Sequence, residues 1–122
     1  MADSIFEAIG GKSTILATVN AFYRRVLADK QLSHFFEHVD TGTLETRQGM
    51  FLTMLLGGRV LDSGDQIRSA HKGSRAAGLN DLHFDVFINH FRGALNEAGV
   101  PPDSLEKIMQ LLESKRDAVL GR

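Results

Sequence analysis

Cysteine is absent from the 122-residue sequence, which excludes disulfides, thiolate zinc sites, iron–sulfur clusters and cysteine nucleophiles. An excess of either charge is also lacking, because 14 lysines and arginines face 15 aspartates and glutamates. This balance gives no electrostatic case for nucleic acid or an anionic membrane as a partner. No apolar run approaches the ~18 residues of a membrane-spanning helix, and the start MADSIFEAIGG holds none long enough for a signal peptide. We therefore expect a cytoplasmic protein.

The alternating period of a half-buried strand is found nowhere convincingly, whereas apolar residues recur at helical spacing over most of the chain. No repeat, low-complexity run or linker divides the sequence, and this length is typical of one domain. We predict a single all-α domain over residues 1–122. Ser13 or Thr14 is expected to cap its first long helix, and Asn80 or Asp81 its third. The four apolar stripes are Ile15, Val19, Phe22 and Val26, widened by Leu16 and Leu27; Leu44, Phe51, Leu52 and Leu55; Phe84, Phe87, Ile88, Phe91 and Leu95; and Leu105, Ile108, Met109 and Leu112.

Residues 57–81 interrupt this pattern with a glycine-punctuated stretch that follows neither a helical nor a strand period. A long structureless connection inside a compact domain is unusual unless it is functional or disordered. Ile67, Ala70 and Leu79 give the stretch apolar anchors, which favours function over disorder. His71 lies in its middle. We interpret the stretch as the border of a cofactor held by His71.

Two polar residues stand where the helical pattern expects apolar ones. Gln48 falls within the apolar face of its helix, and Tyr23, the only tyrosine, falls within the stripe before it. A buried polar group without a partner costs a few kcal/mol, so each needs a hydrogen bond. Each could bond a nearby backbone carbonyl or a buried water. Alternatively, both point into an apolar pocket and together suit a small polar ligand.

The other histidines carry weaker signals. His34 and His38 are four residues apart with Glu37 beside them, a spacing that suits a divalent metal, although no definite third ligand follows. His83 and His90 flank the third apolar stripe. Of these, His83 is the main competitor to His71 as a cofactor ligand, because it also lies near the irregular stretch.

A series of short motifs in a fixed order completes the pattern. It comprises Gly10-Gly11, Phe22-Tyr23 within AFYRRVLADKQLSHFF, Phe35-Phe36, Phe51-Leu52 before Gly57-Gly58, Ala70-His71 and His83-Phe84. In this order and spacing the chain resembles the truncated haemoglobins of group I, over about residues 5–118. The resemblance implies a two-over-two helical sandwich around haem b.

The same resemblance implies roles for single residues. His71 aligns with the proximal iron ligand, Phe36 with a phenylalanine against the haem face, and Tyr23 and Gln48 with distal residues. Leu44 stands where many relatives carry a glutamine, so one distal donor is missing. Arg47 replaces a histidine that coordinates iron in certain cyanobacterial relatives, which leaves the iron pentacoordinate or open to exchange, and Arg47 could instead reach a haem propionate. The distal pocket implied by the resemblance consists of Tyr23, Leu44, Gln48, Phe51 and Leu52.

The function implied is reversible binding of oxygen, nitric oxide and carbon monoxide, in a monomer or weak dimer. Nitric oxide dioxygenation is a further possibility, with an external reductase because the sequence holds no flavin or nicotinamide motif. Leu52 and the small residues around Gly57-Gly58 would then line a gas tunnel. Two alternatives are open: a cofactor-free helical interaction domain, and a non-haem metal protein using His34, Glu37 and His38.

Overall fold

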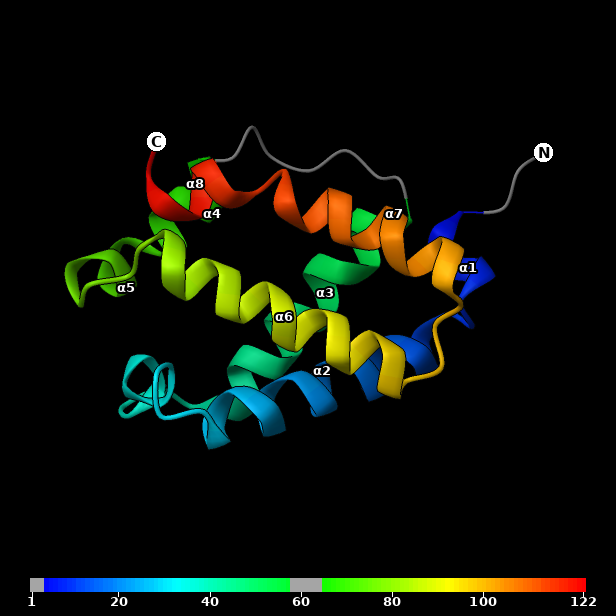
Figure 1. The fold of residues 1–122 in the computed structure, drawn as a ribbon, viewed down its shortest axis with the longest axis horizontal. Helices are drawn as coiled ribbons and strands as arrows, with labels where there is room; N and C mark the ends of the chain where they lie inside the picture. The colour runs from blue at the N-terminus through cyan, green and yellow to red at the C-terminus, as the bar shows by residue number, and fades with distance from the viewer. Residues whose placement is uncertain (1–3, 58–64) are drawn as a thin grey trace.

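A computed structural model of the chain describes residues 4–57 and 65–122, and within these ranges it contains helices and no strand (Figure 1). This agrees with the all-α prediction. The elements are α1 (Ile5–Ala8), α2 (Lys12–Ala28), the 3-10 helix η1 (Ser33–Phe36), α3 (Thr41–Leu56), α4 (Asp65–Ala70), α5 (Lys72–Ala76), α6 (Asp81–Glu97), α7 (Pro102–Glu113) and α8 (Arg116–Leu120).

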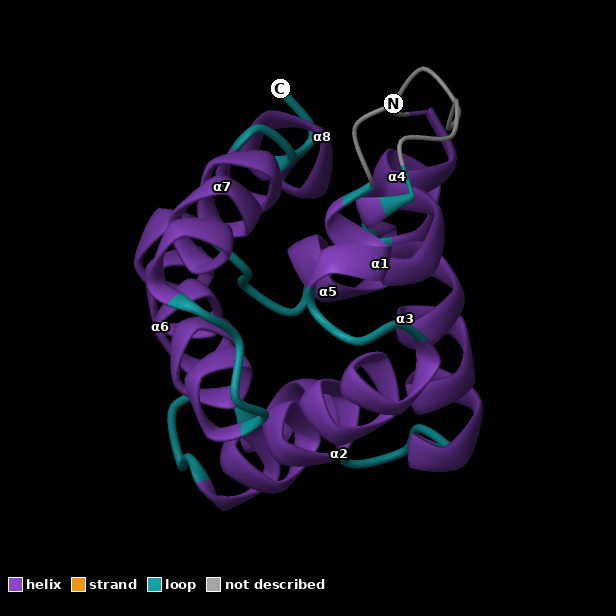
Figure 2. Cartoon of the chain, turned by 90° about the vertical axis from the view of Figure 1, so that its right-hand side faces the viewer, coloured by secondary structure: helices purple, strands orange, loops and turns teal. Residues whose placement is uncertain are grey.

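Two pairs of long helices form the frame of the molecule. Helix α2 packs on both α3 and α6, and α6 packs on α7. Figure 2 shows α6 and α7 on one side and α3 on the other, with α2 running along the bottom between them. The rings of Phe22 and Phe91 stack with centroids 3.9 Å apart and join α2 to α6. Val26, Leu52, Leu95 and Ile108 are essentially inaccessible to solvent, so the core lies between the two pairs.

The stripe on α2 is narrower than the sequence suggests. Ile15, Val19 and Val26 are buried as predicted, whereas Leu16 is 57% exposed and Leu27 is 42% exposed. The prediction that both leucines widen the buried stripe is therefore wrong. A helix that packs on two neighbours can still leave the edges of its apolar face open to water.

The ends of the helices confirm one predicted cap and correct another. The side chain of Asn80 accepts hydrogen bonds from the backbone of Leu82 and His83, as expected for the cap of α6. Helix α2 instead begins after Gly11, whose φ of 67° is costly for other residues. Thr14 does not cap α2, because its hydroxyl donates to the carbonyl of Ile9 at 2.6 Å.

The irregular stretch contains two short helices, α4 and α5, which its sequence does not reveal. They have six and five residues, too few to display a helical period. The interpretation of residues 57–81 as a stretch without regular structure is wrong for this part. Gly58, assigned to a gas tunnel with Gly57 and Leu52, lies outside the described residues. Among those described, no helix has the length and apolar character needed to cross a membrane.

Candidate functional site

His71 lies at the junction of α4 and α5, where it caps the second of these helices. Its ring nitrogen Nδ1 is 2.7 Å from the carbonyl oxygen of Ile67, one helical turn earlier. A carbonyl oxygen can only accept a hydrogen bond, so Nδ1 carries the proton. The other ring nitrogen, Nε2, therefore bears a lone pair in the neutral ring and can act as a ligand.

The surroundings of His71 favour this neutral form. Burial lowers the pKa of the imidazole below its usual value, and the positive charge of Arg75 lowers it further. The hydrogen bond to the Ile67 carbonyl acts in the opposite direction but does not outweigh burial. At neutral pH the structure thus presents an oriented, unprotonated nitrogen, which is the form of histidine that binds metals.

Tyr23 combines a buried ring with a hydroxyl that no other group in the described residues engages. The residue is 5% exposed, and its ring meets the edges of Phe22 and Phe36 at centroid distances of 5.1 and 6.0 Å. In the described residues, every side-chain oxygen or nitrogen that is fully buried has a hydrogen-bond partner. The Tyr23 hydroxyl has no such partner there, so it is not among the fully buried atoms. Its hydroxyl therefore opens onto space that solvent can reach.

The hydroxyl of Tyr23 stays protonated at neutral pH. Burial raises the pKa of Tyr23 to about 12, with a further contribution from the negative charge of Glu45. A neutral tyrosine can donate one hydrogen bond. The interpretation of Tyr23 as a donor aimed into a pocket is thus consistent with its burial and its charge state, and the alternative of a bond to a backbone carbonyl finds no counterpart in the described residues.

Helix α3 carries the remaining residues assigned to the distal pocket, together with Arg47, which was assigned to the cofactor. Leu52 is fully buried, Leu44, Gln48 and Phe51 are partly buried, and Arg47 is exposed. Gln48 makes no hydrogen bond to the described residues, so its amide, like the hydroxyl of Tyr23, is available to a ligand.

Aromatic rings connect Tyr23 to neighbouring elements. Phe36 of η1 contacts Phe87 of α6 at 6.0 Å as well as Tyr23, and Phe87 also approaches Phe35 and Phe22. The structure thus brings Tyr23 and Phe36 together, while His71 comes from a separate segment. Phe87 and Glu45 were not assigned to the site from the sequence. Glu45 stands three residues before Gln48, so helical spacing alone could have placed it near that face.

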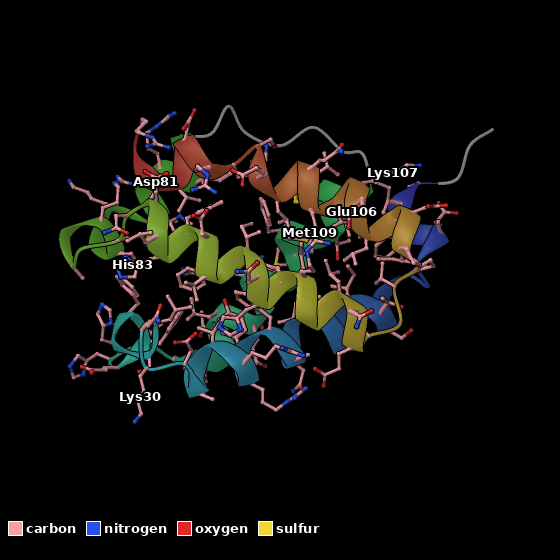
Figure 3. All side chains as sticks on the ribbon, viewed as in Figure 1. Lys30, Asp81, His83, Glu106, Lys107 and Met109 are labelled. Atoms are coloured by element: carbon pink, nitrogen blue, oxygen red, sulfur yellow. The ribbon has the colours of Figure 1, made fainter. Side chains whose placement is uncertain are left out.

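The remaining histidines have other roles in the fold. His83 accepts a hydrogen bond from the backbone of Asn80 through Nδ1 and completes the cap of α6, where its ring faces η1 (Figure 3). His90 contacts the carboxylate of Asp29 at 2.7 Å. His34 and His38 are exposed, and the described residues contain no group of three metal-ligating side chains.

Comparisons with known proteins place this arrangement in a family. A family model for bacterial-like globins matches residues 4–120. The group 1 truncated haemoglobin of Tetrahymena pyriformis is 37% identical over 119 residues, which cover 98% of this chain and 96% of that protein. The group 1 truncated haemoglobin of Synechocystis is 36% identical over 106 residues, 86% of each chain. The chain is a member of the group 1 truncated haemoglobins.

Solved structures confirm the two-over-two architecture of this truncated haemoglobin. The 2/2 haemoglobin of Synechococcus, in the cyanomet state with covalently attached haem, has a TM-score of 0.89 and 31% identity, with 98% of this chain and 99% of that chain covered. The truncated haemoglobin of Tetrahymena pyriformis in its Fe(III) form has a TM-score of 0.85 and 37% identity, with 98% and 100% covered. The cofactor of this truncated haemoglobin is haem, and its ligands are diatomic gases such as oxygen.

The described residues fit a haem group. An imidazole with its Nδ1 proton held by a carbonyl and its Nε2 available is the donor that globins offer to iron. A buried tyrosine whose hydroxyl has no partner in the described residues could accompany it as a hydrogen-bond donor. The alternatives of a cofactor-free interaction domain and of a non-haem metal protein are set aside for this truncated haemoglobin.

Proposed function

We propose that His71 is the proximal ligand of haem b and that the protein binds oxygen reversibly, with Tyr23 and Gln48 as distal hydrogen-bond donors. The observation that carries the proposal is the neutral imidazole of His71, oriented by its 2.7 Å contact with the Ile67 carbonyl. Haem supplies an iron with one coordination position open to a diatomic gas. The protein would supply the His71 nitrogen as the iron ligand and the Tyr23 hydroxyl as a hydrogen-bond donor to the gas.

The side chains have distinct tasks in this proposal. His71 holds the cofactor through Nε2, and the Ile67 carbonyl fixes the plane of its ring. The Tyr23 hydroxyl would donate a hydrogen bond to a gas ligand that carries partial negative charge, and the Gln48 amide would be a second donor. Phe36 and Leu44 provide apolar surface against the macrocycle. Arg47 is exposed on α3 and is assigned to a haem propionate.

Nitric oxide and carbon monoxide are proposed as further ligands, and nitric oxide dioxygenation as a further activity. The specific observation in its favour is the pair of unengaged donors on α2 and α3, because dioxygenation requires oxygen to be retained until nitric oxide arrives. The activity also needs an electron donor from another protein. Variants of the Tetrahymena pyriformis protein with a tyrosine changed to phenylalanine, and with a glutamine changed to glutamate, have been solved in the Fe(III) form.

Stopped-flow kinetics of the haem-loaded protein test the proposal. Release of bound oxygen, measured by its replacement with carbon monoxide, should be slow, and oxygen binding should be fully reversible. A pulse of nitric oxide should be consumed in one turnover by the oxygen-loaded protein, and repeatedly when an external reductase is added. Rapid irreversible oxidation without reversible oxygen release would contradict oxygen binding as the function. Reversible release with a single turnover despite reductase would restrict the function to oxygen carriage.

A further inference from the structure

The segment that carries His71 packs on helix α8. Helices α4 and α5 have six and five residues, and isolated helices of this length are not stable in water. Helix α4 packs on α8, the last helix of the chain, and α5 packs on α4. Figure 1 shows α8 beside α4 at the same end of the molecule.

Two arginines from the His71 segment bind backbone oxygens in and just after α8. Arg75 Nη1 donates to the carbonyl of Val119, in the last turn of α8, at 3.0 Å, and Arg68 Nη2 donates to the backbone oxygen of Arg122, two residues past that helix, at 3.4 Å. The last carbonyls of a helix lack partners within the helix and carry partial negative charge, so a guanidinium group suits the Val119 carbonyl. Arg75 is also tied to His71 through the backbone, because its N–H donates to the His71 carbonyl at 3.0 Å.

Helix α8 is in turn held to the start of α6. Arg116 binds Asp81 at 3.0 Å, binds Asp85, and lies over the Phe84 ring at 4.5 Å from its centroid. Arg122 reaches the second oxygen of Asp81 at 2.9 Å. Figure 3 places Asp81 at the end of α6 that meets the C-terminal helix. A continuous chain of contacts thus runs from α6 through α8 to the His71 segment.

We propose that α8 positions the His71 imidazole, with Arg75 as the positioning residue that connects the two. This inference rests on the proposed role of His71 as the haem ligand. Arg75 does not touch the cofactor in the proposal. Its guanidinium binds the Val119 carbonyl, and its backbone N–H binds the His71 carbonyl. Through these two contacts Arg75 sets the orientation of the His71 ring and of Nε2.

The test compares Arg75→Met with Arg92→Met in the full-length, haem-loaded protein. Arg92 is the matched control, because it joins α6 to α7 through Glu106 at 2.5 Å without contacting α4, α5 or α8. We expect Arg75→Met to shift or broaden the iron–histidine stretching band of the ferrous form in resonance Raman spectra. We also expect it to release hemin roughly 10-fold faster, the order of effect of a lost hydrogen bond to a charged group. Arg92→Met should match the wild type in both measurements.

Gly121→Ala and the His71→Gly background provide two further tests of the positioning role. Gly121 has a φ of 78°, and a Cβ there would stand 2.8 Å from Arg75 Nε. Gly121→Ala thus displaces Arg75 without removing it and should repeat the spectral change, even if Arg75→Met fails to fold. In His71→Gly loaded with haem and free imidazole, the ligand is no longer attached to the chain, so adding Arg75→Met should change the iron–imidazole band no further.

Three results would overturn the positioning role. These are an unchanged band in both Arg75→Met and Gly121→Ala, an equal change in Arg92→Met, and a change of the same size in the His71→Gly background. A wild-type protein that shows no histidine-ligated haem would instead overturn the proposed function itself, before any variant is compared.

Discussion

Replacing Tyr23 by phenylalanine removes one hydroxyl group and leaves the ring in place. The ring contacts that hold Tyr23, the edges of Phe22 and Phe36 at 5.1 and 6.0 Å, do not involve the oxygen. No hydrogen bond within the described residues is lost either, because the hydroxyl has no partner there. We therefore expect Tyr23→Phe to fold with unchanged or slightly raised stability and to bind haem as the wild type does.

The effect on oxygen release should be large. A hydrogen bond to a charged acceptor contributes ~1.5–3 kcal/mol, because the acceptor is more basic than a neutral carbonyl. Since 1.4 kcal/mol corresponds to a factor of ten, oxygen should dissociate roughly 10- to 100-fold faster from Tyr23→Phe. The raised pKa of Tyr23, about 12, keeps the donor protonated over the whole neutral range, so the effect should not depend on pH between 6 and 9. Carbon monoxide accepts a hydrogen bond more weakly, and its release should change less.

Stopped-flow replacement of oxygen by carbon monoxide measures this rate directly. The matched control is Thr18→Val, which removes another buried hydroxyl from the same helix, one that donates to the Thr14 carbonyl at 2.8 Å. It should lower stability without altering oxygen release. An oxygen dissociation rate in Tyr23→Phe within twofold of the wild type would show that Tyr23 does not hold bound oxygen, as would an equal acceleration for carbon monoxide.

Three further predictions concern other residues of the site and the fold. Gln48→Leu should accelerate oxygen release by roughly 2- to 10-fold, the effect of a neutral hydrogen bond, and an unchanged rate would remove Gln48 from the distal pair. Below about pH 6.5 His71 binds a proton in the unfolded chain but not in the folded apoprotein, where its pKa is lowered, so the free energy of unfolding decreases as the pH is lowered. Urea titrations at pH 7 and pH 5 should show a smaller decrease for His71→Gln than for the wild type. Gly10→Ala should destabilise the protein by roughly 1–3 kcal/mol in the same assay, because φ is 111° and the added Cβ would lie 2.5 Å from Thr14 Oγ1.

Residues that break a local pattern were the ones that sequence reasoning could select as candidates for the site. Tyr23 and Gln48 are polar residues at apolar positions, and His71 stands in a stretch without a clear period. The cap at Asn80 was also predictable, because its side chain satisfies backbone donors only one turn away. Each of these signals can be recognised from residues that lie within a few positions of one another along the chain.

Features that depend on distant partners were not predictable in this way. Nothing in the local sequence shows that Leu16 and Leu27 lie outside the contact with α3 and α6. The binding of Arg116 to Asp81 joins α8 to α6 across a long stretch of chain, and so does the contact of Arg75 with Val119. Long-range ion pairs leave no periodic signal, so the support of the His71 segment by α8 emerges only from the three-dimensional structure.

A hemin titration followed by absorption spectroscopy shows whether His71 ligates the haem iron. Wild type, His71→Gly and His83→Gly are each mixed with equimolar hemin and recorded in the ferric, ferrous and carbon monoxide forms. We expect a sharp Soret band and a carbon monoxide band typical of histidine ligation in the wild type and in His83→Gly, and the loss of that band in His71→Gly. Retention of the band in His71→Gly, with its loss in His83→Gly, would contradict the account and move the proximal ligand to His83.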